Sequence, residues 1–273
     1  MENIPRLSFV QQQQVLAYLG LAAAPPTLAF LEQLVAAYAS HVPWETASRI
    51  ARKANTPLWR ECPRFAELFW QEAVTQGTGG TCFESNYAFF ALLRSLGYEG
   101  YLTVNNMGEQ IGCHTAIVLL LDGQKWLADV GIPLYVPLPL DAAAITTRHT
   151  PFHQYTVIPL GPNLYQIERT HHPKPVIFTL IDTPVPDAAY REALTQDYGP
   201  DGLFLNRIVV TKLIRGRAWL YNPQEFPDRL ISFREGERQE TPLNAPIAAS
   251  LAHHFALDEQ VIHQALEQLS GNH

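Results

Sequence analysis

The chain has few cysteines, few charged side chains and no hydrophobic run long enough to span a membrane. Cysteine occurs only three times in 273 residues, and this low, odd number excludes a disulfide framework and suits a reducing compartment. Charged residues make up 16% of the chain and hydrophobic residues 47%, which excludes a disordered protein. Apolar runs such as Ala116–Leu121 are far shorter than the about 20 residues that a membrane helix needs.

Basic residues are also too few for a protein that binds nucleic acid by neutralising phosphates. The chain has 19 Lys+Arg against 26 Asp+Glu, a formal net charge of −7. Its first residues, MENIPRLSFVQQQQ, show no basic segment followed by an apolar stretch, so we expect no secretory signal. The composition therefore predicts a cytoplasmic globular protein that binds neither nucleic acid nor membrane.

Hydrophobic spacing predicts helices in the first part of the chain. The ranges 28–38, 63–75 and 83–96 carry apolar residues at helical spacing. Thr27 is a plausible N-cap for the first range, and Gly97 is a natural left-handed stop after the third. The third range is apolar nearly all round, so we expect this helix to be buried among other elements.

Beyond residue 100 the pattern changes to short strands. β-branched and aromatic runs alternate with Gly, Pro, Asn and Asp, a spacing that predicts an antiparallel meander or a small barrel. The segment 183–202 is the expected crossover between lobes, and the tail returns to helix with Asp258 as its N-cap. We therefore predict an α+β fold with three parts: a helical bundle (1–97), a β-barrel (98–195) and a C-terminal α/β lobe (196–273).

Cys82 lies between a glycine-rich turn at 77–80 and the start of the predicted buried helix. The first free N–H groups of a helix, together with its positive dipole end, stabilise a thiolate and lower the thiol pKa. The same N–H groups can also hold a developing oxyanion. Many free cysteines only fill space in a core, so Cys82 taken alone fits a packing role as well as a catalytic one.

Two predicted strands joined by an Asp-Gly pair at 122–123 supply a base and a carboxylate. An Asp-Gly pair between strands predicts a two-residue type I′ turn. The resulting register places His114 opposite Gly131 and makes His114 and Asp129 diagonal neighbours on one face. A carboxylate that fixes one imidazole nitrogen leaves the other free as a base. The pair alone also fits an ordinary sheet contact, but together with Cys82 it favours a catalytic Cys-His-Asp triad.

The other cysteines, the paired histidines and the basic residues give weaker signals. Cys62 and Cys113 lack the flanking features of a nucleophile, and strand alternation turns Cys113 away from the His114 face, so we interpret both as packing residues. The paired histidines lack the second ligand pair that zinc needs, so we expect no metal; they are His149 and His153, His171 and His172, and His253 and His254. The densest basic cluster fits a coenzyme phosphate and a solvated strand face equally well: Arg207, Lys212, Arg215 and Arg217.

The triad candidates lie in motifs that resemble the arylamine N-acetyltransferase family. Members typically carry Arg-Gly-Gly-x-Cys-Phe-Glu, and the chain has TGGTCFE at 78–84. In the family a histidine opens one strand and Asp-Val-Gly closes the next, as His114 and the residues 129–131 do here. The segment HVPWE at 41–45 is similar to the family's His-x-x-Pro-Phe-Glu. The similarity is good over residues 15–135 and is limited to the order of the lobes beyond them.

The resemblance implies a helical bundle, a β-barrel and a C-terminal α/β lid around a cysteine-protease-like core. It also implies ping-pong acyl transfer from acetyl-coenzyme A to a small-molecule amine, in which Cys82 carries the acetyl group, His114 is the base and Asp129 orients the base. Gly131 and Ile132 would then line the acceptor pocket. The coenzyme A contacts, the acyl chain length and the oligomeric state stay open.

Two positions depart from the family pattern. The family's arginine is Thr78 here, so the acidic Glu45 must find another partner or lie in water. The aromatic residue that usually follows Asp-Val-Gly is Ile132, followed by Pro133, so a preference for flat arylamines does not follow from the sequence. The alternatives are a hydrolase or transglutaminase-like enzyme with the same Cys-His-Asp order, an amide synthase of a polyketide pathway, and a non-catalytic descendant that only binds.

Overall fold

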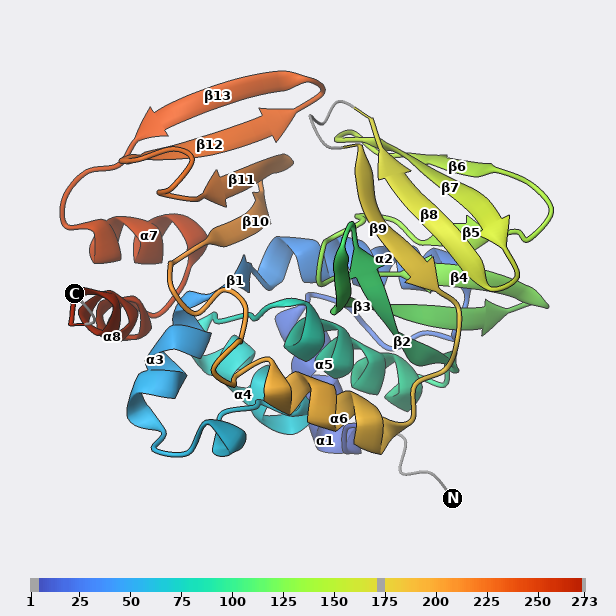
Figure 1. Cartoon of the computed structure of the whole chain (residues 1–273), viewed down its shortest axis with the longest axis horizontal. Helices are drawn as coiled ribbons and strands as arrows, with labels where there is room; N and C mark the ends of the chain where they lie inside the picture. Colours follow the sequence, from blue (N-terminus) through green and yellow to red (C-terminus); the bar gives the residue numbers. More distant parts are fainter. Residues whose placement is uncertain (1–4, 171–174, 272–273) are drawn as a thin grey trace.

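The computed structural model describes residues 5–170 and 175–271, which form a helical lobe, a β-barrel and a C-terminal lobe (Figure 1). The helical lobe consists of α1 (Phe9–Tyr18), α2 (Leu28–His41), the short strand β1 (Trp44–Glu45), α3 (Ala47–Asn55), the 3-10 turn η1 (Trp59–Glu61), α4 (Ala66–Gln76) and α5 (Cys82–Ser95). The barrel strands are β2 (Glu99–Met107), β3 (Gln110–Leu121), β4 (Gln124–Ala128), β5 (Leu138–Leu140), β6 (Thr146–His149), β7 (Gln154–Gly161), β8 (Leu164–Arg169) and β9 (Val176–Ile181). The rest comprises α6 (Asp187–Gln196), β10 (Val210–Ile214), β11 (Arg217–Tyr221), β12 (Arg229–Arg234), β13 (Glu237–Pro242), α7 (Ile247–Phe255) and α8 (Glu259–Ser270).

The predicted helices form around the buried helix α5. The Thr27 side chain accepts the Phe30 N–H at 3.2 Å and so caps α2, as the sequence predicts. The helix predicted from residue 63 begins only at Ala66, because the Arg64 N–H donates to the Glu84 carboxylate and holds this segment outside the helix. Helix α5 is buried over almost its full length, in agreement with its all-round apolar pattern.

The barrel is an antiparallel sheet of eight strands in the order β5-β4-β3-β2-β9-β8-β7-β6. The edge strands approach each other, where the Thr146 hydroxyl donates to the Pro139 carbonyl at 2.6 Å, so the barrel is nearly closed. The turn at 122–123 has the two positive φ angles of type I′, 51° and 77°. It sets the predicted register of β3 and β4, from Leu121 opposite Gln124 to Ile117 opposite Ala128.

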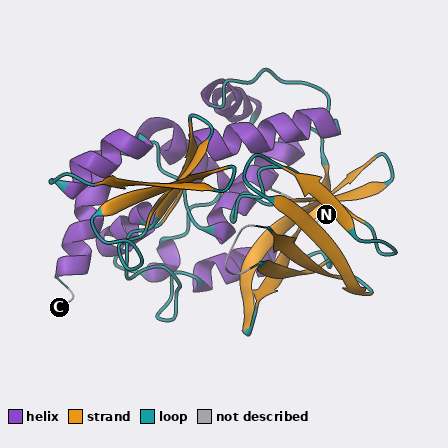
Figure 2. Ribbon diagram, turned by 90° about the horizontal axis from the view of Figure 1, so that it is seen from above, coloured by secondary structure: helices purple, strands orange, loops and turns teal. Residues whose placement is uncertain are grey.

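The C-terminal lobe is a second sheet, in the order β1-β10-β11-β12-β13, packed with helices α7 and α8. Figure 2 shows the two sheets as separate bodies, with helices packed beside them. Strand β1 comes from the helical lobe and pairs with β10, so this sheet joins the helical lobe to the C-terminal lobe. The predicted tail helix is α8, and the Asp258 carboxylate caps it by accepting the Gln260 and Val261 N–H groups.

The segment 183–202 does connect the barrel to the C-terminal lobe, but it also contains helix α6. Tyr190 and Leu194 of α6 are fully buried in the same core as α5. Separate apolar cores fill the helical lobe, the barrel and the C-terminal lobe. The division at residues 97 and 195 stays a prediction.

Within residues 5–170 and 175–271, no helix is both long and apolar enough to cross a membrane.

Candidate active site

The glycine-rich turn before α5 is held by contacts that leave no room for larger side chains. A Cβ at Gly79 would lie 1.7 Å from the Pro43 carbonyl oxygen, so only glycine fits. The Gly79 N–H donates to the Glu45 carboxylate at 3.1 Å, and the Glu45 N–H donates to the Gly80 carbonyl at 3.3 Å. The turn and strand β1 thus fix each other, and this sets where Cys82 begins its helix.

Glu45 finds its partners without the family arginine. Its carboxylate is fully buried and accepts the backbone N–H of Ser48 at 2.9 Å, the Ser48 hydroxyl and the Gly79 N–H. Neutral donors therefore satisfy this carboxylate, which neither pairs with a cation nor lies in water. The Thr78 side chain is buried, and its hydroxyl has no hydrogen-bond partner among the described residues.

A different arginine, Arg64, braces the turn from the segment before α4. Its guanidinium is fully buried, donates to the Gly79 carbonyl at 2.7 Å and forms an ion pair with Glu84 of α5 at 2.5 Å. A second ion pair joins it to Glu72 at 3.1 Å. Although burial alone raises the pKa of Glu84, the Arg64 guanidinium holds that pKa below its usual range. No motif in the sequence points to Arg64.

Cys82 is the first residue of α5, one residue before the predicted start of this helix, and only 8% of it is exposed. The side chain of the preceding Thr81 accepts no hydrogen bond from the first turn of α5, so this hydroxyl does not occupy the N–H groups beside the thiol. Burial raises the pKa of the Cys82 thiol, and the Asp197 and Asp129 carboxylates raise it further. The expected lowering by the helix terminus is thus outweighed, because a buried thiolate loses its hydration and lies near two carboxylates. A neighbouring base must therefore take the proton.

His114 and Asp129 form the close pair that the sequence predicts. His114 Nε2 lies 2.7 Å from Asp129 Oδ2, and both side chains are almost fully buried. The imidazole also packs against the Phe178 ring at a centroid distance of 4.6 Å. Its other nitrogen, Nδ1, is buried and has no partner among the described residues. With Nε2 donating to the carboxylate, Nδ1 is the free acceptor that a general base requires.

The position of Gly131 differs from the predicted register. Strand β4 ends at Ala128, so the pairing of β3 with β4 stops at Ile117 and does not extend to His114, which pairs only on the other side of β3, with Asn105 of β2. A Cβ at Gly131 would lie 2.5 Å from the Cys82 Cα. This glycine therefore lets the hairpin approach the start of α5, whereas the sequence placed it opposite the histidine. The approach brings Cys82 to the His–Asp pair: its Sγ lies 3.7 Å from the carbonyl oxygen of Cys113, the neighbour of His114.

Asn86, one helical turn after Cys82, is a site residue that the sequence-based analysis missed. Its amide donates to Asp129 Oδ1 at 3.0 Å and accepts the Val130 N–H at 3.0 Å. The N–H groups of Gly131 and Ile132 also donate to Asp129 Oδ1, at 2.8 and 3.1 Å. Three donors on Oδ1 leave Oδ2 to the histidine, so the carboxylate has one orientation. The i, i+4 spacing from Cys82 was the available signal.

Thr115 and Tyr190 tie the barrel and the crossover helix to the nucleophile's helix. The Thr115 hydroxyl donates to the Cys82 carbonyl at 3.0 Å, and the Tyr190 hydroxyl donates to the Phe83 carbonyl at 2.9 Å. Tyr190 lies in α6, within a segment that the sequence indicated only as a crossover.

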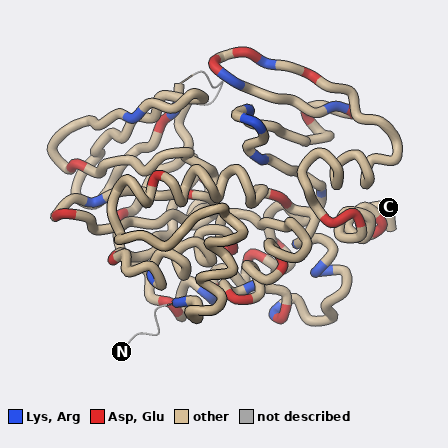
Figure 3. The backbone as a smooth tube through the Cα atoms, turned by 180° about the vertical axis from the view of Figure 1, so that it is seen from behind, with Lys and Arg blue, Asp and Glu red and all other residues tan. Residues whose placement is uncertain are grey.

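In the part of the chain that the structure describes, the side chains of the remaining candidates form no hydrogen bond with the Cys82, His114 or Asp129 side chains. Cys62 is fully buried, whereas Cys113 is half-buried with its thiol 3.4 Å from the Gln110 carbonyl. Among the described residues no group of three His, Cys, Asp or Glu side chains could hold a metal; His171 and His172 lie outside them. The basic cluster does not converge on one place: Arg215 and Arg217 line a cavity of about 320 Å³, Lys212 lines another of about 460 Å³, and Arg207 lines neither and donates to the Gln224 side chain at 2.8 Å. Figure 3 shows basic and acidic residues interspersed along the chain.

Comparison with known proteins agrees with this architecture. The N-acetyltransferase family model matches residues 27–258, most of the chain. Comparison with curated protein sequences gave no match. The fold is similar to arylamine N-acetyltransferases of known structure. The enzyme from Mycobacterium marinum, solved in complex with CoA, has a TM-score of 0.79 and 18% sequence identity, and the match covers 95% of this chain and 98% of that chain. The enzyme from Mycobacterium abscessus has a TM-score of 0.75 and 21% sequence identity, and the match covers 95% of each chain.

A third similar structure is an arylamine N-acetyltransferase from Bacillus cereus, described as having a unique Cys-His-Glu catalytic triad. It has a TM-score of 0.73 and 18% identity, and covers 92% of this chain and 100% of that chain. These findings define the class of the protein, which is an acetyltransferase. More narrowly, the chain belongs to the arylamine N-acetyltransferase family.

Proposed function

We propose that the chain transfers an acetyl or other acyl group from acyl-coenzyme A to an amine through a thioester on Cys82. The observation that carries the proposal is the buried His114–Asp129 pair at 2.7 Å, in which His114 Nδ1 has no partner among the described residues. The Cys82 thiol lies beside this pair, because its Sγ is 3.7 Å from the carbonyl oxygen of Cys113, the residue before His114. Family membership and the coenzyme A complex of the M. marinum relative support acyl-coenzyme A as the donor.

The first half-reaction moves the acyl group to the protein. His114 Nδ1 takes the Cys82 proton, and Sγ attacks the carbonyl carbon of the donor thioester. The tetrahedral oxyanion faces the uncapped first-turn N–H groups of α5. When it collapses, the bond between the carbonyl carbon and the coenzyme sulfur breaks, and the imidazolium returns its proton to the departing coenzyme thiolate.

The second half-reaction moves the acyl group to the amine. The amine nitrogen attacks the Cys82 thioester, His114 accepts the proton lost from nitrogen, and Cys82 leaves and is reprotonated. Asp129 holds the ring in one tautomer and stabilises the imidazolium that forms twice per cycle. The glutamate in the B. cereus relative's triad shows that the third position can hold another carboxylate in this fold, which fits an orienting role for Asp129.

The acceptor pocket is proposed at Gly131 and Ile132. The Ile132 side chain is half-buried and packs against the barrel core, while its N–H is bound to Asp129. An aliphatic side chain followed by Pro133 offers no aromatic face for stacking. We therefore propose a small amine as the acceptor, without a requirement for a flat aryl ring.

The test is an intact-mass measurement after adding acetyl-coenzyme A alone. We expect a stable gain of one acetyl group that is lost in Cys82→Ala and kept in Cys113→Ala, a matched control from the neighbouring strand. A panel of amines should then discharge the adduct as N-acetyl products. No adduct with acetyl or longer acyl donors would refute the proposal, and discharge by water alone would indicate the hydrolase alternative.

A further inference from the structure

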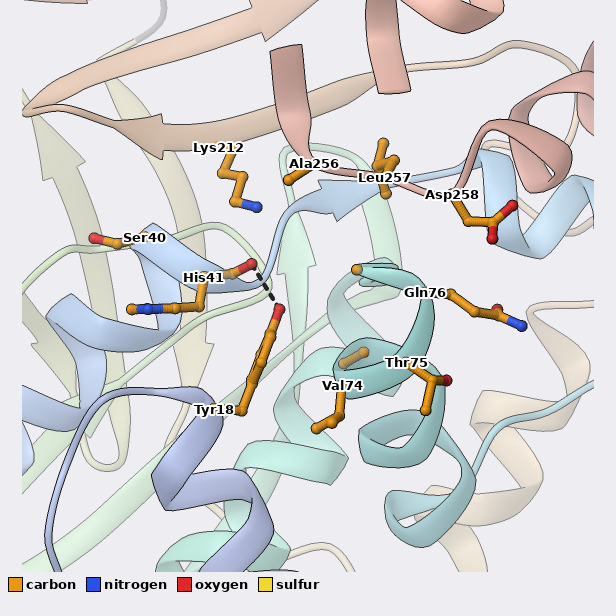
Figure 4. Close-up of a pocket in the computed structure, with 12 residues that line it drawn as sticks. Tyr18, Ser40, His41, Val74, Thr75, Gln76, Lys212, Ala256, Leu257 and Asp258 are labelled. Carbon is orange, nitrogen blue, oxygen red and sulfur yellow. Dashed lines mark hydrogen bonds between the residues drawn. The ribbon is translucent and has the colours of Figure 1, made fainter. Parts of the chain in front are cut away.

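A cavity between the lobes contains an amine that the acyl transfer described above does not use. The cavity has a volume of about 460 Å³ and is lined by residues of α1, α2, α4, β10 and the segment 256–258. Figure 4 shows Lys212 reaching into it from β10, with the Tyr18 hydroxyl below donating to the His41 carbonyl at 2.9 Å. Lys212 is the only lysine or arginine among the lining residues.

The Lys212 amine has no carboxylate partner in the part of the chain that the structure describes. Its Nζ donates to the Phe255 carbonyl at 2.8 Å, and it forms no ion pair with a carboxylate of the described residues. The nearby Asp258 carboxylate lines the same cavity, but it is occupied by capping α8. Burial lowers the pKa of Lys212 to about 8. At pH 8 about half of the amines are then neutral, against roughly one in 250 for an ordinary lysine of pKa about 10.4.

The other described lysines differ from Lys212 in this respect. Lys125 forms an ion pair with Asp182 at 2.6 Å, and although burial alone lowers its pKa, Asp182 holds that pKa above the usual range. Lys53 donates to the Gly199 carbonyl at 3.4 Å and lines no such cavity. A desolvated, unpaired amine is the form of lysine that acts as a nucleophile.

We propose that Lys212 is an acylation site that takes an acyl group directly from an acyl thioester entering this cavity. The neutral Nζ attacks the thioester carbonyl carbon, the bond from this carbon to sulfur breaks, and the thiol leaves with the proton lost from nitrogen. The product is an amide on Lys212 and a free thiol. A volume of about 460 Å³ leaves room for a small acyl group beside the amine. The donor class rests on the proposed function, but the attack does not involve Cys82.

The test uses the Cys82→Ala protein, in which no thioester can form at the triad. The protein is incubated with limiting acetyl-coenzyme A at pH 8, digested, and the acetylated fractions of Lys53, Lys125 and Lys212 are quantified. We expect Lys212 to react about tenfold faster than Lys125, because its larger neutral fraction outweighs its lower basicity. Equal rates at Lys212 and Lys125 would overturn the proposal.

Two further arms separate this proposal from the proposed function. In wild-type protein, acetylation of Lys212 without any adduct on Cys82 would refute the proposed thioester on Cys82 and would support direct acylation of Lys212. Acetylation of Lys212 only when Cys82 is present would instead overturn direct attack.

Val74 lines the same cavity and is 40% exposed, so Val74→Trp should fold and obstruct entry. It should slow Lys212 several-fold and leave Lys53 unchanged, and an unchanged Lys212 rate would refute the role of the cavity.

Discussion

Replacing Arg64 by methionine should destabilise the protein strongly, because it leaves a buried carboxylate without its cation. Arg64→Met keeps most of the side-chain stem but removes the guanidinium that pairs with Glu84 at 2.5 Å and Glu72 at 3.1 Å. Arg64 and Glu84 are 0% and 1% exposed as side chains. Removing one partner of a buried ion pair costs about 3–5 kcal/mol, far more than the pair itself contributes over an apolar replacement.

The magnitude translates into a measurable shift in thermal unfolding. For a chain of this size about 1 kcal/mol corresponds to roughly 2–4 °C, so we expect the midpoint to fall by about 10 °C. Differential scanning calorimetry measures this. The double variant Arg64→Met, Glu84→Gln should recover part of the loss, because it removes the unpaired charge and leaves the neutral amide bonded to the Tyr198 hydroxyl, which lies 2.7 Å from the Glu84 carboxylate.

The matched control is Arg229→Met. Arg229 pairs with Glu240 at 2.6 Å, a distance similar to that of the buried pair, but the two side chains are 49% and 39% exposed. Solvent screens such a pair, so we expect no measurable change in the midpoint. If Arg64→Met lowers the midpoint no more than Arg229→Met does, the view that Arg64 braces the turn before Cys82 is wrong.

Three further predictions concern the site and its supports. Gly131→Ala places a Cβ 2.5 Å from the Cys82 Cα, so the rate of Cys82 acetylation, followed by intact mass, should fall at least about tenfold. Asn86→Ala should lower kcat/KM about 10–100-fold, because Asp129 loses a donor that orients it; an unchanged kcat/KM would leave Asn86 only a packing role. Since the pKa of Glu84 is lowered in the folded state, ionised Glu84 should stabilise the fold at neutral pH, and this contribution should be lost as the pH falls below about 4.3. In Glu84→Gln the free energy of unfolding should therefore depend less steeply on pH in this acid range.

The elements predicted best were those whose signals are local. The Thr27 cap, the turn at 122–123 and the Asp258 cap each depend on a few adjacent residues, and the structure contains all three. The exposed strand β13, Glu237–Pro242, was not predicted, because both of its faces are polar and it shows no alternation. Helix α6 was predicted only as a crossover, since just two of its side chains, Tyr190 and Leu194, are buried.

The candidate residues of the site could be predicted from the sequence, but the residues that hold them in place could not. Motif and register together indicated Cys82, His114 and Asp129, and their catalytic roles stay a prediction. The partners of Glu45 and the bracing by Arg64 could not be read from the sequence, because they depend on where a separate segment passes the turn. The raised pKa of the Cys82 thiol was likewise hidden, because the burial that causes it comes from the whole assembly of lobes.

Because β1 pairs with β10, the site depends on two segments of the chain that are synthesised at different times. Trp44 pairs with Thr211, and the Thr46 hydroxyl donates to the Arg207 carbonyl at 2.7 Å, so the segment that fixes the turn before Cys82 is itself completed by the last third of the chain. A ribosome delivers the N-terminal part first. In the nascent chain Cys82 is therefore made well before Arg207 and Thr211, so the segment that fixes the turn before Cys82 lacks these partners until β10 has been synthesised.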